Sequence, residues 1–271
     1  MECKGRPVGV CSWSLQTDVP GVAKAMKDLG LEHVHLGIRP ALGAEGAACL
    51  EAIQAQDWTI TSTMIDFPQE DYSTLETIKV TGGIVPDDCW EANRALFAAA
   101  AELTAKLGVK YLSTHAGFID EGDEAYAAKI TKRLRSLADL AENAGVILLL
   151  ETGQETAEEL ATFMEKLDHN SVGVNFDPAN IILYNKGNPI AAVRWLAPWI
   201  RHLHVKDATR TKEPGTWGAE VPWGDGEVGI AEFLKVLGEI GFEGPMAIER
   251  EAGDDRFGDI KVAVERLKAA G

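Results

Sequence analysis

Short segments of alternating apolar and polar residues recur along this chain, and each is followed by a longer amphipathic segment. Strand side chains point to alternate faces, so a period of two predicts strands, whereas a period of 3.6 predicts helices. The predicted strands are 7–14, 31–38, 58–67, 109–115, 146–151, 172–177, 200–205 and 245–249. The predicted helices are 22–29, 44–56, 90–107, 123–143, 156–167, 188–196, 230–240 and 257–270.

This strict alternation predicts a parallel sheet with right-handed crossovers. The strand at 146–151 is almost entirely apolar, as expected for a sheet whose outer face is covered by helices. Strand–helix units of this number in 271 residues favour a closed (β/α)₈ TIM barrel, with 1–271 as a single domain. The alternative is an open doubly wound sheet, but residues 12–15 do not form the Gly-rich phosphate turn that such sheets usually carry.

Two connections are longer than simple turns require. They span 68–89 and 206–229. Because long irregular loops in a compact domain are usually functional, we expect both to lie over the C-terminal face of the barrel.

Composition narrows the classes of partner. The chain has 26 basic and 42 acidic residues, a net charge of −16, which argues against nucleic acid because phosphate binding needs a basic surface. We predict a cytoplasmic protein with no membrane partner, because no apolar run is long enough to span a bilayer and no secretory signal is recognisable. The four cysteines form no C-x-x-C pair, so they predict neither a zinc knuckle nor a redox motif.

The segment 201–210 contains several polar side chains that predict a functional site. His202 and His204 share one face of a strand, while Leu203 and Val205 share the other. A strand with imidazoles on one face and aliphatic side chains on the other is expected to line a polar cavity.

The last four predicted strands each end in a potential metal ligand: Glu151, Asp177, His204 and Glu249. Neighbouring strands lie about 4.8 Å apart, so side chains at consecutive strand ends can converge on one ion. A carboxylate that points into a barrel must be paired or bound to metal, because an isolated buried charge is very costly. The four residues therefore predict a metal site at the C-terminal face.

Each ligand also has a structural interpretation. Glu151 and Asp177 could satisfy helix N-termini, His204 could be a core histidine, and Glu249 could pair with Arg250, although alternation places those two on opposite faces. Their coincidence on successive strands favours a shared cation. Three carboxylates and one imidazole suit Mn²⁺ best, with Mg²⁺, Co²⁺ or Zn²⁺ as alternatives.

The chain as a whole resembles the xylose isomerase-like superfamily, in its sugar isomerase/epimerase branch with the ketose 3-epimerases. The resemblance is carried by Glu151, by the sequence Phe-Asp-Pro-Ala-Asn at 176–180, by His204 followed six residues later by Arg210, and by Glu249. It implies that Glu151 and Glu249 are acid/base groups as well as metal ligands, and that Arg210 contacts substrate. It also makes a homo-oligomer a possibility.

This sequence departs from the family at Asn180, where a histidine is common. The DNA-repair endonuclease branch needs further histidines for a three-metal cluster. No histidine ends the third strand, at Met64–Asp66, and the net charge does not suit DNA, so we reject that branch. The remaining candidates for binding a sugar substrate lie at or near strand ends: Trp13, His35, His115, Asn180, Lys206 and Asp207.

A divalent ion can bind a sugar carbonyl and its neighbouring hydroxyl, and two carboxylates can then move a proton at the adjacent carbon. Return of the proton gives epimerisation or isomerisation through an enediolate, whereas loss of a β-hydroxyl gives dehydration. We therefore expect a sugar isomerase or epimerase. The alternatives are a lyase acting on a keto-sugar, keto-inositol or dehydroshikimate, and a non-catalytic sugar-binding barrel.

Overall fold

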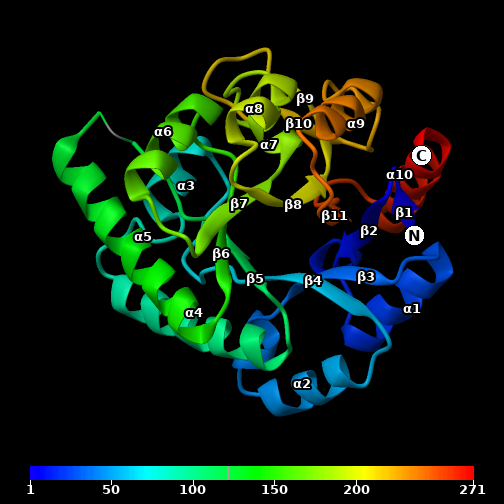
Figure 1. Ribbon diagram of the computed structural model, residues 1–271, viewed down its shortest axis with the longest axis horizontal. Coiled ribbons are helices and arrows are strands. Elements are labelled where there is room, and N and C mark those ends of the chain that lie inside the picture. The colour runs from blue at the N-terminus through cyan, green and yellow to red at the C-terminus, as the bar shows by residue number, and fades with distance from the viewer. Residues whose placement is uncertain (121) are drawn as a thin grey trace.

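The computed structural model describes residues 1–120 and 122–271. Its centre is a closed barrel of parallel strands, in which β2 pairs with both β3 and β11 and so leaves no free edge (Figure 1). The barrel strands are β2 (Arg6–Cys11), β3 (His33–Gly37), β4 (Thr59–Met64), β5 (Tyr111–Thr114), β6 (Ile147–Glu151), β7 (Val172–Phe176), β8 (Ile200–Val205) and β11 (Met246–Ile248). The predicted TIM barrel is confirmed, and the open sheet is excluded.

Helices surround the barrel and cover the apolar outer faces of its strands (Figure 1). They are α1 (Val19–Leu29), α2 (Gly46–Gln54), α4 (Trp90–Lys106), α5 (Glu124–Ala144), α6 (Ala157–Leu167), α8 (Pro189–Leu196), α9 (Ile230–Glu239) and α10 (Arg256–Ala270). Local sequence sets several of their ends. The Asp18 side chain accepts a hydrogen bond from Gly21 N at the start of α1, and Gly30 ends that helix with φ of 70°. Among the described residues, none of the helices combines the length and apolar character needed to cross a membrane.

The two long connections contain secondary structure that the sequence pattern did not predict. Within 68–89 lies α3 (Leu75–Thr81), whose N-terminus is closed by a capping box between Thr74 and Thr77. Within 206–229 lies a hairpin of β9 (Asp207–Thr209) and β10 (Ala219–Val221). These elements are too short to show a clear period in sequence.

Two further short elements flank the barrel. β1 (Glu2–Cys3) pairs antiparallel with β2, and α7 (Pro178–Leu183) directly follows β7. 3₁₀ turns at Ser12–Leu15 and Arg39–Leu42 follow β2 and β3. The turn after β2 ends a strand that we had predicted to continue to residue 14.

Candidate metal centre

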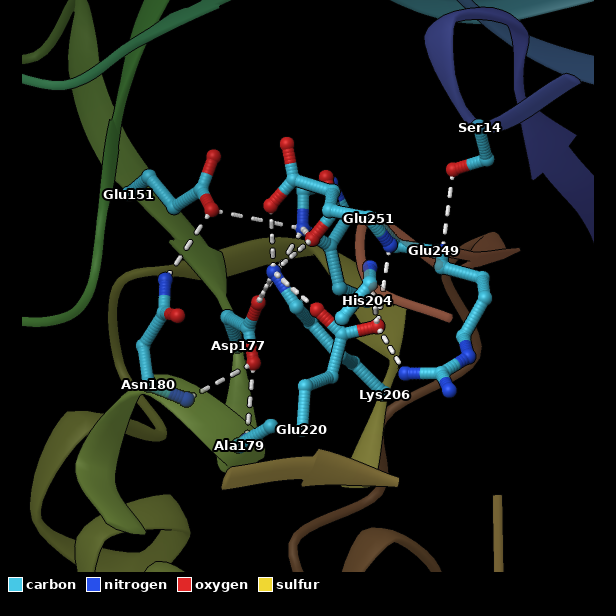
Figure 2. Close-up of polar contacts among 12 residues, drawn as sticks. Ser14, Glu151, Asp177, Ala179, Asn180, His204, Lys206, Glu220, Glu249 and Glu251 are labelled. Atoms are coloured by element: carbon cyan, nitrogen blue, oxygen red, sulfur yellow. Dashed lines mark hydrogen bonds and ion pairs between the residues drawn. The ribbon is translucent and has the colours of Figure 1, made fainter. Parts of the chain in front are cut away.

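The barrel brings together the four predicted ligands at the C-terminal ends of β6, β7, β8 and β11. One ligand atom from each of Glu151, Asp177, His204 and Glu249 lies within 4.8 Å of those of the other three, and all four side chains are buried. The strands are adjacent in the barrel, which is why residues far apart in sequence meet here. Figure 2 shows the carboxylates around the His204 ring.

Distances within the cluster fit a single small cation. His204 Nδ1 lies 3.4 Å from an oxygen of Glu151, 3.5 Å from Asp177 Oδ2 and 3.2 Å from Glu249 Oε2. Octahedral bonds of about 2.1 Å place adjacent ligands about 3 Å apart. These distances are therefore close to those of ligands that share one ion.

Two buried atoms of the cluster lack a hydrogen-bond partner: Asp177 Oδ2 and His204 Nδ1. Buried polar atoms are nearly always satisfied, so two orphaned atoms that face the same point indicate a missing ligand. Oxygen and imidazole donors are those that Mn²⁺ or Mg²⁺ would accept. The residues present therefore fit a divalent cation.

The two carboxylate oxygens of Asp177 make different contacts. Oδ1 accepts hydrogen bonds from Ala179 N and Asn180 N and so caps α7, while Oδ2 points to the other ligands. The N-cap that we considered as an alternative to metal binding is thus present together with the site. Pro178 at the first helical position favours this abrupt start of α7.

Lys206 lies within the same cluster and provides a buried positive charge. Its Nζ is 2.8 Å from Glu249 Oε2 and 3.8 Å from Asp177 Oδ2, two of the oxygens that face His204. It also contacts Glu251 at 2.7 Å and Glu220 at 3.8 Å (Figure 2). The Lys206 side chain is only 3% exposed, so its ammonium balances much of the acidic charge around the site.

The electrostatics of the site follow from this arrangement. Burial alone lowers the pKa of His204, but the charges of Glu249 and the other acidic neighbours raise it well above its ordinary value. Burial likewise raises the pKa of Glu249, yet His204 and Lys206 together hold it well below its usual range. The raised pKa of His204 and the buried Lys206 ammonium thus both offset the acidic charge of the cluster.

Predicted substrate-binding residues surround the two glutamates. Trp13 Nε1 donates to Glu249 Oε1 at 2.8 Å, and Asn180 Nδ2 donates to Glu151 Oε1 at 3.2 Å. His115 Nε2 lies 3.6 Å from the same Glu151 oxygen. Trp13, His115, Asn180 and Lys206 all line the cavity above the cluster, where a substrate could reach them.

His35 occupies a different position from the one that we predicted. It is fully buried below the cluster, with Nδ1 3.1 Å from His204 Nε2, and so contacts one of the four predicted ligands and does not line the cavity among the described residues. Asn175 and His202 complete this lower layer. The Asn175 amide lies 3.0 Å from His204 Nε2 and 2.9 Å from His202 Nδ1.

Two predicted substrate contacts lie away from the cavity. The guanidinium of Arg210 binds Glu227 at 3.3 Å and Asn185 at 3.2 Å, and Arg210 is not among the described residues that line the cavity. Asp207 is buried and accepts hydrogen bonds from the backbone N–H groups of Ala208, Gly224, Gly226 and Val228. Asp207 therefore holds the loop 206–229 together, because its carboxylate binds the backbone of the turn at 222–226 beside β9.

Several residues of the site were not predicted from the sequence. Glu251 and Glu220 both contact Lys206, and Glu220 Oε1 also accepts from Arg250 at 2.7 Å. Glu251 lies beyond the end of β11, where alternation no longer predicts the direction of a side chain. Glu220 belongs to the unpredicted hairpin. Tyr72, Tyr184 and Trp217 add aromatic surface to the cavity wall.

The cavity above the cluster has a volume of about 1420 Å³. It is bordered by both long connections, since Pro68 and Tyr72 belong to one, and Trp217 and Glu220 to the other. That both connections cover the C-terminal face stays a prediction, for which these cavity-lining residues are the support. The cavity, which is open to solvent, thus has aromatic and acidic side chains in its wall above the proposed ligands.

Comparison with known proteins places this architecture in a family. Residues 23–270 match the family model described as the xylose isomerase-like TIM barrel. An inosose dehydratase from Clostridium botulinum is 26% identical over 148 residues, 49% of each chain. A D-psicose 3-epimerase from Ruminiclostridium cellulolyticum is 28% identical over 123 residues, 43% of this chain and 38% of that protein. The chain thus matches about half the length, or less, of these curated relatives.

A crystal structure of a xylose isomerase domain protein from Planctomyces limnophilus superimposes with a TM-score of 0.87 and 31% identity, covering 98% of this chain and 96% of that one. A D-psicose 3-epimerase with D-tagatose from Clostridium cellulolyticum has the same fold, with a TM-score of 0.70 and 17% identity over 97% of this chain and 98% of that one. The family match covers almost the whole barrel. The chain therefore belongs to the xylose isomerase-like TIM barrel family.

Proposed function

We propose that this protein is a divalent-metal-dependent sugar isomerase or epimerase that removes a proton α to a carbonyl and passes through an enediolate. The observation that carries the proposal is the convergence of Glu151, Asp177 and Glu249 on His204 Nδ1, at the base of a large cavity. Mn²⁺ is the proposed ion, with Mg²⁺, Co²⁺ or Zn²⁺ as alternatives.

The four ligands would hold the ion at the cavity floor. When bound, it would polarise a sugar carbonyl and an adjacent hydroxyl as a Lewis acid and so make the neighbouring C–H acidic. Glu151 and Glu249 approach from β6 and β11, on opposite sides of the β7 and β8 ligands. One carboxylate would remove the proton. In epimerisation the other would pass a proton taken from solvent to the opposite face of the same carbon, and in isomerisation a proton would be returned to the neighbouring carbon.

Neighbouring residues would orient these two groups. Trp13 and Lys206 fix the two oxygens of Glu249 through contacts of 2.8 Å each. Asn180 donates to Glu151, and His115 lies beside it. We also propose that Trp13, His115, Asn180 and Lys206 contact the substrate, because each lines the cavity.

Dehydration of a keto-sugar or keto-inositol is the second candidate. It is supported by the inosose dehydratases among the relatives, and by the Lys206 ammonium beside Glu249, which supplies a donor for a departing hydroxyl. In this reaction the α-carbon loses its proton, the β-carbon loses hydroxide, and water leaves. The cytoplasmic location and the homo-oligomer stay predictions.

Proton NMR in D₂O distinguishes these reactions. The protein with added Mn²⁺ is incubated with free and 3-keto sugars. We expect deuterium at the carbon next to the carbonyl in a product of otherwise unchanged composition, whereas a lyase would yield a product that has lost water. Glu249→Gln should abolish exchange, while Glu243→Gln, at an exposed position, should retain it. Sugar binding without exchange would support a non-catalytic barrel and contradict the proposal.

A further inference from the structure

The cavity above the metal centre extends well beyond it. Besides the residues near the four ligands, its lining includes residues of α1 and α2, on the side of the barrel formed by β2, β3 and β4 (Figure 1). Sites for drug-sized ligands usually enclose roughly 300–1,000 Å³. The cavity here, about 1420 Å³, therefore has room for a larger molecule than one sugar ring.

We propose that the substrate is a sugar joined to a second, apolar group, and that this group lies in the part of the cavity between α1 and α2, here called the side arm. The proposal rests on the proposed function, because it takes the sugar to be bound at the metal centre. The side arm is lined by Val19, Pro20, Val22, Ala48, Cys49, Ala52 and Trp58.

The chemistry of the side arm indicates an apolar occupant. Its walls are aliphatic apart from the Cys49 thiol and the Trp58 indole. Of the polar groups near it, Asp18 Oδ1 accepts from Gly21 N and Arg39 Nε lies 3.1 Å from Asp66 Oδ1, while Thr17 and Glu45 also line this end of the cavity. A hydroxyl-rich or charged group would thus find few unpaired partners here, whereas an aromatic or alicyclic group would bury its surface favourably.

Trp13 lies where the side arm joins the metal centre. Its Nε1 donates to Glu249, and its ring lies close to Gly37 at the end of β3, where an added Cβ would be 3.5 Å from Trp13 Cε3. Gly37 N in turn donates to Ser12 Oγ at 2.9 Å, which fixes this turn against β3. A substrate that reaches both parts of the cavity would pass along the Trp13 indole, a surface suited to sugar or aromatic rings.

The α2 helix offers a matched pair of variants. Ala48 is exposed and lines the side arm, whereas the adjacent Ala47 is exposed but is not among the described lining residues. Ala48→Trp should fill the arm, and Ala47→Trp adds the same surface elsewhere. Ala52→Phe, one helical turn from Ala48, provides a second filling variant should the first fold poorly.

The test compares 3-keto-glucose with phenyl 3-keto-β-glucoside. Their affinities for the Mn²⁺-loaded protein are measured by titration calorimetry. We expect the phenyl compound to bind about tenfold more tightly or better, because burying an aromatic ring contributes more than the free energy of a tenfold change. Ala48→Trp and Ala52→Phe should remove this advantage while leaving the affinities for 3-keto-glucose and Mn²⁺ unchanged. Ala47→Trp should retain it.

Equal affinities for the two compounds in the wild-type protein would overturn the proposal, even if 3-keto-glucose exchanges its C–H in D₂O and so supports the proposed function. Failure of both compounds to bind and to exchange would instead reject the proposed function, and the side-arm assignment with it. Light scattering provides a further readout. If Ala48→Trp changes the oligomeric mass but not the ratio of affinities, the side arm is an interface between copies of the chain and the proposal is wrong.

Discussion

His35 Nδ1 lies 3.1 Å from His204 Nε2, directly below the proposed metal centre. The other nitrogen of His35, Nε2, is 3.3 Å from the carbonyl oxygen of Thr63, which can only accept a hydrogen bond. Burial and the charge of His204 lower the pKa of His35 to about 3, so its ring is neutral. His35 therefore carries its proton on Nε2, and its Nδ1 is an acceptor for His204 Nε2–H.

As placed, the Asn175 amide requires His204 Nε2 to accept a hydrogen bond, whereas His35 requires it to donate one. As the side chain lies, its Nδ2 faces His204 Nε2 at 3.0 Å and would donate to it. Metal binding at His204 Nδ1 requires the neutral ring to carry its proton on Nε2, which matches His35 but not this orientation of the Asn175 amide. A His204 ring that is protonated in the metal-free protein also carries a proton on Nε2, so in both states we expect the Asn175 amide to present its Oδ1 to His204 Nε2.

Removal of His35 should weaken metal binding. His35→Ala takes away the acceptor that selects the metal-binding tautomer of His204, and loss of such supporting contacts typically costs about 10–100-fold in affinity. Calorimetric titration of Mn²⁺ into metal-free protein measures the change. The control is His33→Ala on the same strand, which should leave the affinity unaltered. Equal effects of the two variants would show that His35 does not select the tautomer.

Asp177→Asn should separate the two roles of this residue. Asparagine keeps an oxygen that can cap α7 but loses the negative charge that faces the other ligands. We expect a thermal midpoint of the metal-free protein within a few degrees of wild type, and a loss of Mn²⁺ affinity of at least tenfold. Asp123→Asn is the matched control, since Asp123 caps α5 away from the site. Unchanged affinity in Asp177→Asn would remove Asp177 from the ligand set.

Metal binding should release a proton and strengthen as pH rises. The raised pKa of His204 means that its ring holds a proton in the metal-free protein at neutral pH, and Nδ1 must lose it to bind an ion. The raised pKa of His204 also stabilises the metal-free fold. This stabilisation is fully present below the unfolded pKa of about 6.5, and it is lost as pH rises through the folded pKa. Titrations in buffers of different ionisation enthalpy count the released protons; a count of zero would contradict this expectation.

Lys206→Met should destabilise the metal-free protein yet favour metal binding. Removing a buried ammonium leaves Glu249 and its acidic neighbours without compensation, which we expect to cost roughly 3–5 kcal/mol of the free energy of unfolding. A divalent ion would replace the lost charge, so the affinity for Mn²⁺ should rise at least tenfold. Urea unfolding with and without Mn²⁺ measures both effects.

The control for Lys206→Met is Lys235→Met, which removes a surface lysine paired with Glu239 at 3.7 Å. It should change neither the free energy of unfolding nor the affinity for Mn²⁺. Should Lys206→Met lose stability equally with and without Mn²⁺, the ammonium and the ion do not share the same oxygens.

The four ligands could be found from sequence because each obeys a periodic rule. Period two directs Asp177 and Glu249 into the barrel, and Glu151, Asp177 and His204 follow one another at intervals of 26 and 27 residues, about the length of one strand–helix unit. The barrel itself follows from the same alternation. These features depend on regular elements, which local sequence specifies well.

The residues outside the barrel strands could not be found in this way. Lys206, Asp207 and Arg210 follow the end of β8, where alternation no longer predicts direction, and only Lys206 turns to the cavity. Asp207 instead satisfies backbone N–H groups, and Arg210 binds Glu227 at the surface of its loop. Glu220 reaches Lys206 through a hairpin whose strands are three residues each, too short to predict.

The central claim is that one divalent ion binds to Glu151, Asp177, His204 and Glu249. Pulsed electron paramagnetic resonance of Mn²⁺ bound to the protein tests it most directly, because coupling to nitrogen reports an imidazole ligand. We predict one Mn²⁺ per chain with coupling to a single imidazole nitrogen, which disappears in His204→Gln. No stoichiometric binding, or a nitrogen signal that persists in His204→Gln, would contradict the claim.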